Sequence, residues 1–346
     1  MSGPLYVPVL PARPHAAEAY RRLRPDVQSA VAPVWNLPTR PGLPPETLAT
    51  EFRRDLAGVV KAQRYRTAWL DAPGVRGAEG SVLAELLEAA TVWGPFRPVT
   101  GPGRPAALQH LVLDVARRAQ DGFGIRVPVP GEWDDLTADR VRELLRRADP
   151  TAPVDLLVDL EAVPADRPEA GKEAVRALDA LIPLAAWRTV ALLSGGFPEV
   201  TADMVEHDLR EVPRTDWRLW QAACATGRSY LKLLAYGDYG TTPPSSLARP
   251  PHNGPGGPAW GVLRYTAEQS FVLARVLSRG DDHVARNRAS ARQLVQHDAF
   301  RGPGAGSAEA WLRDCAHGSG GTGNSTTWLW VGNAQHMTYV VRSMRS

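Results

Sequence analysis

The chain has 346 residues, 44% hydrophobic and 22% charged, a composition typical of a soluble globular protein with a large core. Its formal net charge is only +3, and 3 of its 40 basic residues are lysines, so the pI near 9.0 reflects arginine-rich composition rather than a nucleic-acid-binding surface. No apolar run approaches the roughly 20 residues of a membrane span, and the opening MSGPLYVPVLPARP lacks the pattern of a signal peptide. We therefore expect a cytoplasmic protein.

Short apolar runs recur along the first two thirds of the chain. Such continuous runs are typical of parallel strands that are buried on both faces. The strongest is Val154–Leu160, VDLLVDL in one-letter code. The eight expected strands are Leu5–Leu10, Ser29–Trp35, Arg66–Leu70, Phe96–Thr100, Gly124–Val129, Val154–Leu160, Thr189–Leu193 and Tyr230–Tyr236.

Segments with helical periodicity separate these runs. In Glu46–Gln63, for example, apolar side chains recur every three or four residues. The alternation predicts an α/β fold, a single-domain (β/α)8 barrel of the TIM-barrel type, or a doubly wound sheet if the weaker strands fail. The expected helices are Ala16–Arg24, Glu46–Gln63, Ser81–Val92, Pro105–Gln120, Arg140–Ala148, Glu169–Ala186, Asp203–Glu211 and Asp216–Gly227.

The composition changes after residue 240, which divides the chain into a barrel (1–240) and a Gly/Pro-rich C-terminal extension (241–346) packed over it within the same domain. Thr241–Pro258 should be an irregular loop. Trp260–Tyr265 is expected as a strand, and the capping-box spacing of Thr266 and Gln269 predicts a helix through Val276. Glycine-rich loops at 301–307 and 317–322 precede a terminal strand, expected within Thr326–Val331 or the closing Met337–Met344.

In a (β/α)8 barrel, ligands bind at the carboxyl ends of the strands. The residues expected there are Asn36, Asp71, Thr100, Asp159 or Glu161, Ser194 and Asp238. Asp238, next to Tyr239, could hold a ligand or act in proton transfer, or it could simply cap a turn. His336 could be a general acid or base near neutral pH, or a hydrogen-bonded core histidine.

Two arginines are the best candidates for anion contacts, because a guanidinium binds carboxylate or phosphate bidentately. Arg264 lies in an apolar run and needs a partner, either an acid such as Asp238 or a ligand; Arg214 is the second. Asp159 shares a strand face with Asp155, so an interior salt bridge to an arginine is as plausible as a ligand contact.

The glycine-rich loop that ends at Asn324 could present backbone amides to a phosphate, although it lacks the lysine of a phosphate-binding P-loop. A flexible loop is the alternative. No metal site is expected, because Cys224, Cys315 and the histidines have no ligand spacing. The residues do not point to a cofactor.

Several short motifs resemble the bacteriophage beta-protein family. They are Tyr6-Val7-Pro8-Val9-Leu10, Trp187-Arg188, Gly195-Gly196-Phe197-Pro198, Arg214-Thr215-Asp216-Trp217, Gly237-Asp238-Tyr239, Arg264-Tyr265-Thr266, Gly323-Asn324-Ser325-Thr326-Thr327-Trp328 and Gln335-His336. The resemblance spans the whole chain. It implies a barrel-like α/β fold and an association with phage exclusion or antiphage defence, without an agreed chemistry.

Three functions are compatible with these observations. The first is an anion- or nucleotide-binding pocket at the carboxyl end of the barrel, with or without catalysis. The second is a non-enzymatic protein that acts in phage–host conflict by binding a partner protein, encoded nearby. The third, nucleic-acid processing, is the weakest because basic residues form no run.

Overall fold

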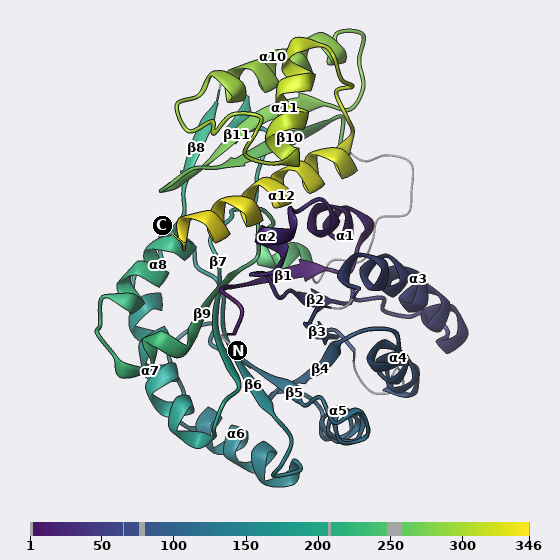
Figure 1. Ribbon diagram of the computed structural model, residues 1–346, viewed down its shortest axis with the longest axis vertical. Coiled ribbons are helices and arrows are strands. Elements are labelled where there is room, and N and C mark those ends of the chain that lie inside the picture. The colour runs from purple at the N-terminus through teal and green to yellow at the C-terminus, as the bar shows by residue number, and fades with distance from the viewer. Residues whose placement is uncertain (1–2, 65, 76–79, 207–208, 248–257, 346) are drawn as a thin grey trace.

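Eight parallel strands close into a barrel in the computed structural model, which describes residues 3–64, 66–75, 80–206, 209–247 and 258–345 (Figure 1). The predicted (β/α)8 architecture is therefore confirmed. Around the barrel the order is β1 (Tyr6–Pro11), β2 (Val34–Asn36), β3 (Ala68–Asp71), β4 (Phe96–Thr100), β5 (Phe123–Pro128), β6 (Val154–Ala162), β7 (Thr189–Gly195) and β9 (Leu234–Asp238).

Helices cover the outside of the barrel and bury the apolar stripes that the sequence shows. In α3, for instance, Leu48, Phe52, Leu56 and Val59 all face the core. Among the described residues, no helix has the length and apolarity that crossing a bilayer requires. The outer helices that lie between barrel strands are α1 (Pro14–Arg21), α2 (Pro25–Gln28), α3 (Pro45–Gln63), α4 (Gly80–Trp93), α5 (Ala106–Ala119), α6 (Leu136–Arg147), α7 (Ala170–Leu181) and α8 (Thr215–Cys224).

The eighth outer position is filled by the end of the chain. Helix α12 (Ser325–Ser343) packs against α1, β1 and β10, between the barrel and the smaller sheet (Figure 1). The expected terminal strand is wrong: Thr326–Val331 is rich in strand-forming residues, but the Asn324 side chain accepts a hydrogen bond from the Thr327 amide (3.1 Å) and starts a helix.

A second, antiparallel sheet lies beside the barrel, in the order β10 (Trp260–Thr266), β11 (Ser270–Leu277), β8 (Arg210–Pro213). The helix expected from Thr266 to Val276 is wrong, because the Ala267 amide bonds to the Ser270 carbonyl (2.8 Å) and turns the chain into a hairpin. Helix α10 (His283–Gln296) covers the sheet, and α11 (Ser307–His317) packs against α10 and α12; the sequence analysis predicted neither helix.

Two other expected elements also change type. The helix expected at Asp203–Glu211 is a 3-10 turn (Asp203–Val205) followed, after the undescribed 207–208, by β8. The strand expected at Tyr230–Tyr236 begins as a 3-10 turn (Ser229–Leu233) and becomes extended only in β9. Part of the loop expected at Thr241–Pro258 lies outside the described residues, and Pro244–Leu247 forms the short helix α9.

The two parts of the chain thus complete each other: β8 precedes residue 240 yet belongs to the second sheet, and α12 follows it yet serves as the eighth barrel helix. Gly237 is required where β9 faces the narrow barrel interior, since a Cβ there would lie 2.3 Å from Leu193 Cδ2 and 2.6 Å from the Val7 carbonyl oxygen. Apolar side chains, among them Leu157 and Ala191, form the middle of that interior.

Candidate functional site

The carboxyl-terminal mouth of the barrel is centred on one buried cation, Arg126 of β5. Its guanidinium contacts the Asp159 carboxylate (2.6 Å) and the Asp71 carboxylate (2.7 Å), and it donates to the Tyr239 hydroxyl (2.8 Å). Burial alone would lower the pKa of Arg126, but Tyr239, Asp159 and Asp71 raise it well above its usual value. Arg126 is therefore a permanent charge that organises the strand ends.

Neighbouring side chains complete this network. Arg126 also donates to the Asn36 side-chain oxygen (3.1 Å), and Arg104, from the loop after β4, donates to Asp71 (2.9 Å). The Tyr239 hydroxyl in turn donates to Asp159 (2.7 Å). Asp159 thus makes the interior salt bridge that the sequence left open, and both it and Tyr239 are occupied by Arg126 rather than free to meet a ligand.

Beside the network lies a cavity of about 250 Å³ that Arg104, Arg126, Asp159 and Glu161 line, called here the Glu161 cavity. Glu161 adopts φ +55°, in the left-handed region that is costly for a side chain. Burial and the nearby Asp159 raise the pKa of its carboxyl group. Glu161 therefore places an exposed carboxyl group in the same cavity lining as Arg104 and Arg126.

A second cavity, of about 350 Å³, lies where the mouth meets the second sheet. We call it the Arg264 cavity. It is bounded by the segment after β1, the loops after β7 and β9, strand β10 and helix α12. Its lining includes Arg13, His15, Phe197, Pro198, Glu199, Pro243, Leu247, Trp260, Arg264 and Leu329.

Arg264 is the least compensated charge in this cavity. Its Nη1 donates to the Val262 carbonyl oxygen (3.2 Å) and its guanidinium lies over the Phe197 ring, 5.5 Å from the centroid. Its Nε is buried without a hydrogen-bond partner, and no carboxylate within the described segments pairs with it. Burial lowers the pKa of Arg264 to about 10.

His15 faces the same positive environment. Burial, and then the charges of Arg13 and Arg264, lower the pKa of His15 to about 4. The imidazole is therefore neutral at physiological pH and can accept a hydrogen bond or a proton. Two guanidiniums and a neutral imidazole in one cavity form a suitable setting for an anion.

Asp238 and His336 meet, but outside both cavities. Asp238 points away from the barrel interior toward α12, where its Oδ2 lies 2.8 Å from His336 Nε2 and its Oδ1 accepts from the Tyr6 hydroxyl. His336 Nδ1 lies 2.9 Å from the Thr266 hydroxyl. Burial opposes ionisation, yet His336, Tyr6 and the Gly240 amide lower the pKa of Asp238 to about 2.

All members of this group are buried, so Asp238 and His336 join the eighth helix to its strand. The expectation that Asp238 pairs with Arg264 is wrong, because residues 264 and 238 have different partners throughout the described structure. Alternation along β9 explains this result: Ala235, Gly237 and Tyr239 face the interior, and Asp238 therefore faces outward.

The other candidate residues also lie in structural positions. Arg214 is 1% exposed and contacts Asp216 (3.7 Å), the Tyr236 hydroxyl (3.5 Å) and the Ala267 carbonyl oxygen (3.3 Å), at the same junction of barrel and sheet. The Asn324 side chain caps α12. Ser194 is buried in register with Asp238. None of these three lines the Arg264 cavity.

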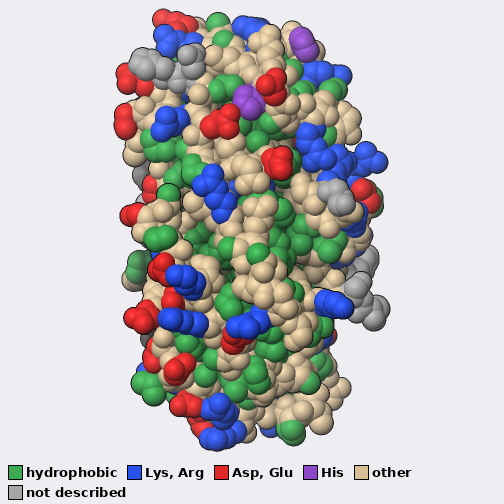
Figure 2. All heavy atoms as spheres, turned by 90° about the vertical axis from the view of Figure 1, so that its left-hand side faces the viewer, with side chains coloured by type: hydrophobic (Ala, Val, Ile, Leu, Met, Phe, Trp, Pro, Cys, Tyr) green, Lys and Arg blue, Asp and Glu red, His purple; other side chains and the backbone are tan. Residues whose placement is uncertain are grey.

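Sequence analysis overlooked Arg13, His15 and Arg126. A clue existed for each: Arg13 and His15 come directly after the first strand, and Arg126 is a lone charge inside the apolar run Gly124–Val129. Across the residues that the structure describes, no group of three or more His, Cys, Asp or Glu side chains is placed to hold a metal ion. On the face in Figure 2, basic and acidic side chains are interspersed without a continuous basic groove.

Comparison with known proteins gives one result. No curated protein matches the chain. The profile of the family described as Beta protein matches residues 6–342, from the first strand to the last helix. This chain belongs to the Beta protein family.

Proposed function

We propose that this protein binds a small anionic ligand in the Arg264 cavity. The observation that carries the proposal is the half-buried Arg264 guanidinium without a carboxylate partner among the described residues. Burial of a charge is unfavourable unless the charge is paired. A ligand carboxylate or phosphate would provide that pair, and the fold keeps the charge in place for it.

The other charged groups favour an anion over a neutral ligand. Arg13 and Arg264 both act on His15, and among the described lining residues the one acidic side chain is Glu199, which accepts a hydrogen bond from Ser245. An anion would offset the two guanidiniums and thereby raise the pKa of His15. Binding should then be accompanied by proton uptake at mildly acidic pH.

The shape of the surroundings indicates an amphipathic ligand. A largely apolar cavity of about 480 Å³ adjoins the Arg264 cavity and shares Phe197, Pro198, Glu199 and Pro243 with it. A ligand with an anionic group at Arg264 and a planar or apolar part along Phe197 would use both cavities. A nucleotide-like molecule has this distribution of charge and apolar surface.

Isothermal titration calorimetry of the full chain with inorganic phosphate and with AMP tests the proposal. We expect AMP to bind more tightly than phosphate, and Arg264→Met to reduce the affinity at least tenfold. Arg286→Met is the matched control, because Arg286 is exposed on α10 and paired with Asp282. Binding that Arg264→Met leaves unchanged, or binding that Arg286→Met weakens equally, would contradict the proposal.

We further propose, from the family's association with phage exclusion, that ligand binding serves antiphage defence. Cells that express the wild-type chain should reduce phage plaque formation, whereas cells with equal amounts of soluble Arg264→Met protein should not. If the variant protects fully, the cavity is dispensable for defence. Protection would then favour the alternative, in which the chain acts by binding a partner protein.

A further inference from the structure

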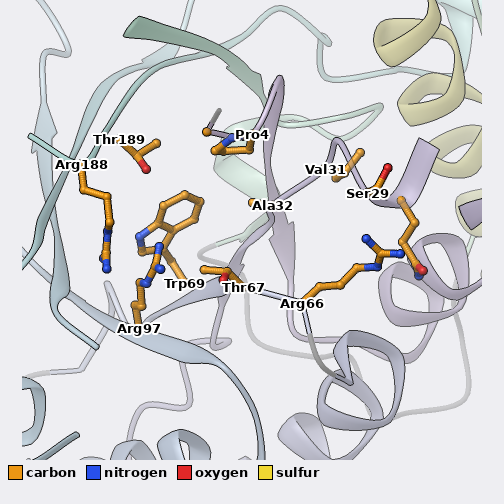
Figure 3. Close-up of a pocket in the computed structure, with 12 residues that line it drawn as sticks. Pro4, Ser29, Val31, Ala32, Arg66, Thr67, Trp69, Arg97, Arg188 and Thr189 are labelled. Atoms are coloured by element: carbon orange, nitrogen blue, oxygen red, sulfur yellow. The ribbon is translucent and has the colours of Figure 1, made fainter. Parts of the chain in front are cut away.

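The opposite end of the barrel contains a larger cavity, of about 530 Å³, which we call the amino-terminal cavity. It lies at the starts of the strands: Pro4 precedes β1, Val31 and Ala32 precede β2, Arg66 and Thr67 precede β3, Arg97 lies in β4, and Arg188 precedes β7 (Figure 3). Its volume is in the range of small-molecule sites. The proposed function does not involve it.

One buried carboxylate, that of Asp155, fixes two of the arginines, Arg97 and Arg188. Asp155 is fully buried and accepts from Arg188 Nε (2.8 Å) and Nη2 (2.5 Å), from Trp69 Nε1 (3.0 Å) and, more distantly, from Arg97 Nη1 (3.5 Å). Figure 3 shows the guanidiniums of Arg97 and Arg188 converging beside the Trp69 ring. Arginines that are fixed in this way lose little conformational entropy when a ligand binds.

The third arginine shifts the charge balance of the cavity. Arg66 lies across the cavity from Arg97 and Arg188, and its guanidinium has no carboxylate partner in the described part of the chain (Figure 3). The acids near the arginines are Asp155 and Asp121; Asp121 is half exposed, 3.3 Å from Arg97. Three guanidiniums therefore face two carboxylates, one of which is partly screened by water.

Structural needs do not account for this arrangement. A single arginine, Arg188, already forms a bidentate pair with Asp155, so neutralising that buried acid does not require Arg97 or Arg66. Thr67 and Thr189 also line the cavity and add hydroxyl donors, whereas the hydroxyl of Ser29, another lining residue, donates to the Asp26 carbonyl oxygen (2.7 Å). Ala32, Val31 and Pro4 form an apolar wall beside them.

We infer that the amino-terminal cavity is a second binding site, for a small molecule that carries phosphate groups. One phosphate contacts Arg97 and Arg188, and the rest of the ligand extends along the apolar wall toward Arg66. Arginine forks suit phosphate oxygens, and the separation of the two basic ends favours a ligand with more than one anionic group. Pyrophosphate and nucleoside diphosphates have this character.

The test uses the full-length Arg264→Met variant, in which the Arg264 cavity should no longer bind an anion. Pyrophosphate or ADP is the probe in calorimetry. We expect binding to persist in this background and to weaken at least tenfold when Arg66→Gln is added. The Arg66 backbone carbonyl, which accepts from Gln63 (2.8 Å), is unaffected by that change. Ser29→Trp provides a second variant, which fills the cavity without removing a charge.

The outcomes separate the two proposals. Binding that is absent in the Arg264→Met background, or unchanged by both Arg66→Gln and Ser29→Trp, overturns the amino-terminal site and leaves the Arg264 site intact. Binding that remains in the Arg264→Met background and that both variants abolish supports the amino-terminal site, whether or not the Arg264 cavity binds an anion. Anomalous density from tungstate soaked into crystals should appear beside Arg97 and Arg188; density confined to the Arg264 cavity would contradict the inference.

Discussion

Replacing Arg264 with methionine should make the ligand-free protein more stable, because the charge that serves a ligand is unpaired without it. Burial lowers the pKa of Arg264 from 12.5 to about 10, and one pKa unit equals about 1.4 kcal/mol, so keeping the charge costs at most about 3.5 kcal/mol. The cavity is open to water, which reduces this figure to about 2 kcal/mol.

Lost contacts offset part of that gain. The cation–π contact with Phe197 contributes about 0.5–1 kcal/mol, whereas methionine retains the packing of the aliphatic stem. The net expectation for Arg264→Met is about 1 kcal/mol of added stability, seen as a rise in Tm of about 1–3 °C. Differential scanning calorimetry without ligand measures it, and AMP should raise the Tm of the wild type but much less that of the variant.

Arg126→Met is the matched comparison, since it also removes a guanidinium at the mouth. Arg126 is paired with Asp71 and Asp159, so its loss leaves the buried Asp159 carboxylate without a cation, while Asp71 keeps Arg104, and should cost about 3–5 kcal/mol. Opposite signs for the two variants are the critical result. If Arg264→Met lowers the Tm as Arg126→Met does, Arg264 is a structural residue and the binding proposal loses its basis.

Buried or strained titratable groups give further expectations. His336→Gln should destabilise the fold by about 2–4 kcal/mol in urea unfolding, because the buried Asp238 carboxylate loses a hydrogen-bond partner; a loss no larger than that of an exposed substitution would contradict this. Since the pKa of Asp238 is about 2 rather than 3.8, its stabilisation is complete above pH 4 and is lost as the pH falls toward 2, a dependence that Asp238→Asn should remove. The pKa of His15, about 4 in the fold against 6.5, makes stability rise with pH between those values and anion affinity rise as the pH falls; His15→Gln should flatten both curves. Glu161→Gly should raise the Tm slightly by relieving φ +55°, and a fall would show that Glu161 makes a stabilising contact.

The strand–helix alternation was readable because each barrel strand is buried on both faces and each helix on one, so apolar periodicity reports the fold directly. Periodicity failed where tertiary contacts outweigh local preference. Ser270–Leu277 follows the capping-box spacing of Thr266 and Gln269 but pairs with β10 and β8. Thr326–Val331 has strand-like residues but packs as a helix on β10 and α1. Both misassigned segments follow β9, in the part of the chain where the regular strand–helix repeat of the barrel ends and no longer guides the prediction.

The candidate site was partly readable for a related reason. Sequence position shows which residues end a strand, and it placed Asn36, Asp71 and Asp159 at the mouth, where they meet Arg126. Whether a residue at such an end faces the interior depends on register, and a shift of one residue reverses the side of every side chain. Asp238 lies one position from Tyr239, so one supports α12 outside the barrel while the other binds Arg126 inside it.

Charge pairing separates binding residues from structural ones more sharply than position does. By residue type alone, Arg126 and Arg214 could hold an anion as well as Arg264 or Arg66, although the sequence analysis named only Arg214 and Arg264. The structure gives these first two their own buried carboxylates, which are Asp71 and Asp159 for Arg126 and Asp216 for Arg214. A ligand would have to displace those partners, whereas at Arg264 and Arg66 it would replace only water. We therefore expect this barrel to bind anions where a guanidinium has no carboxylate partner among the described residues.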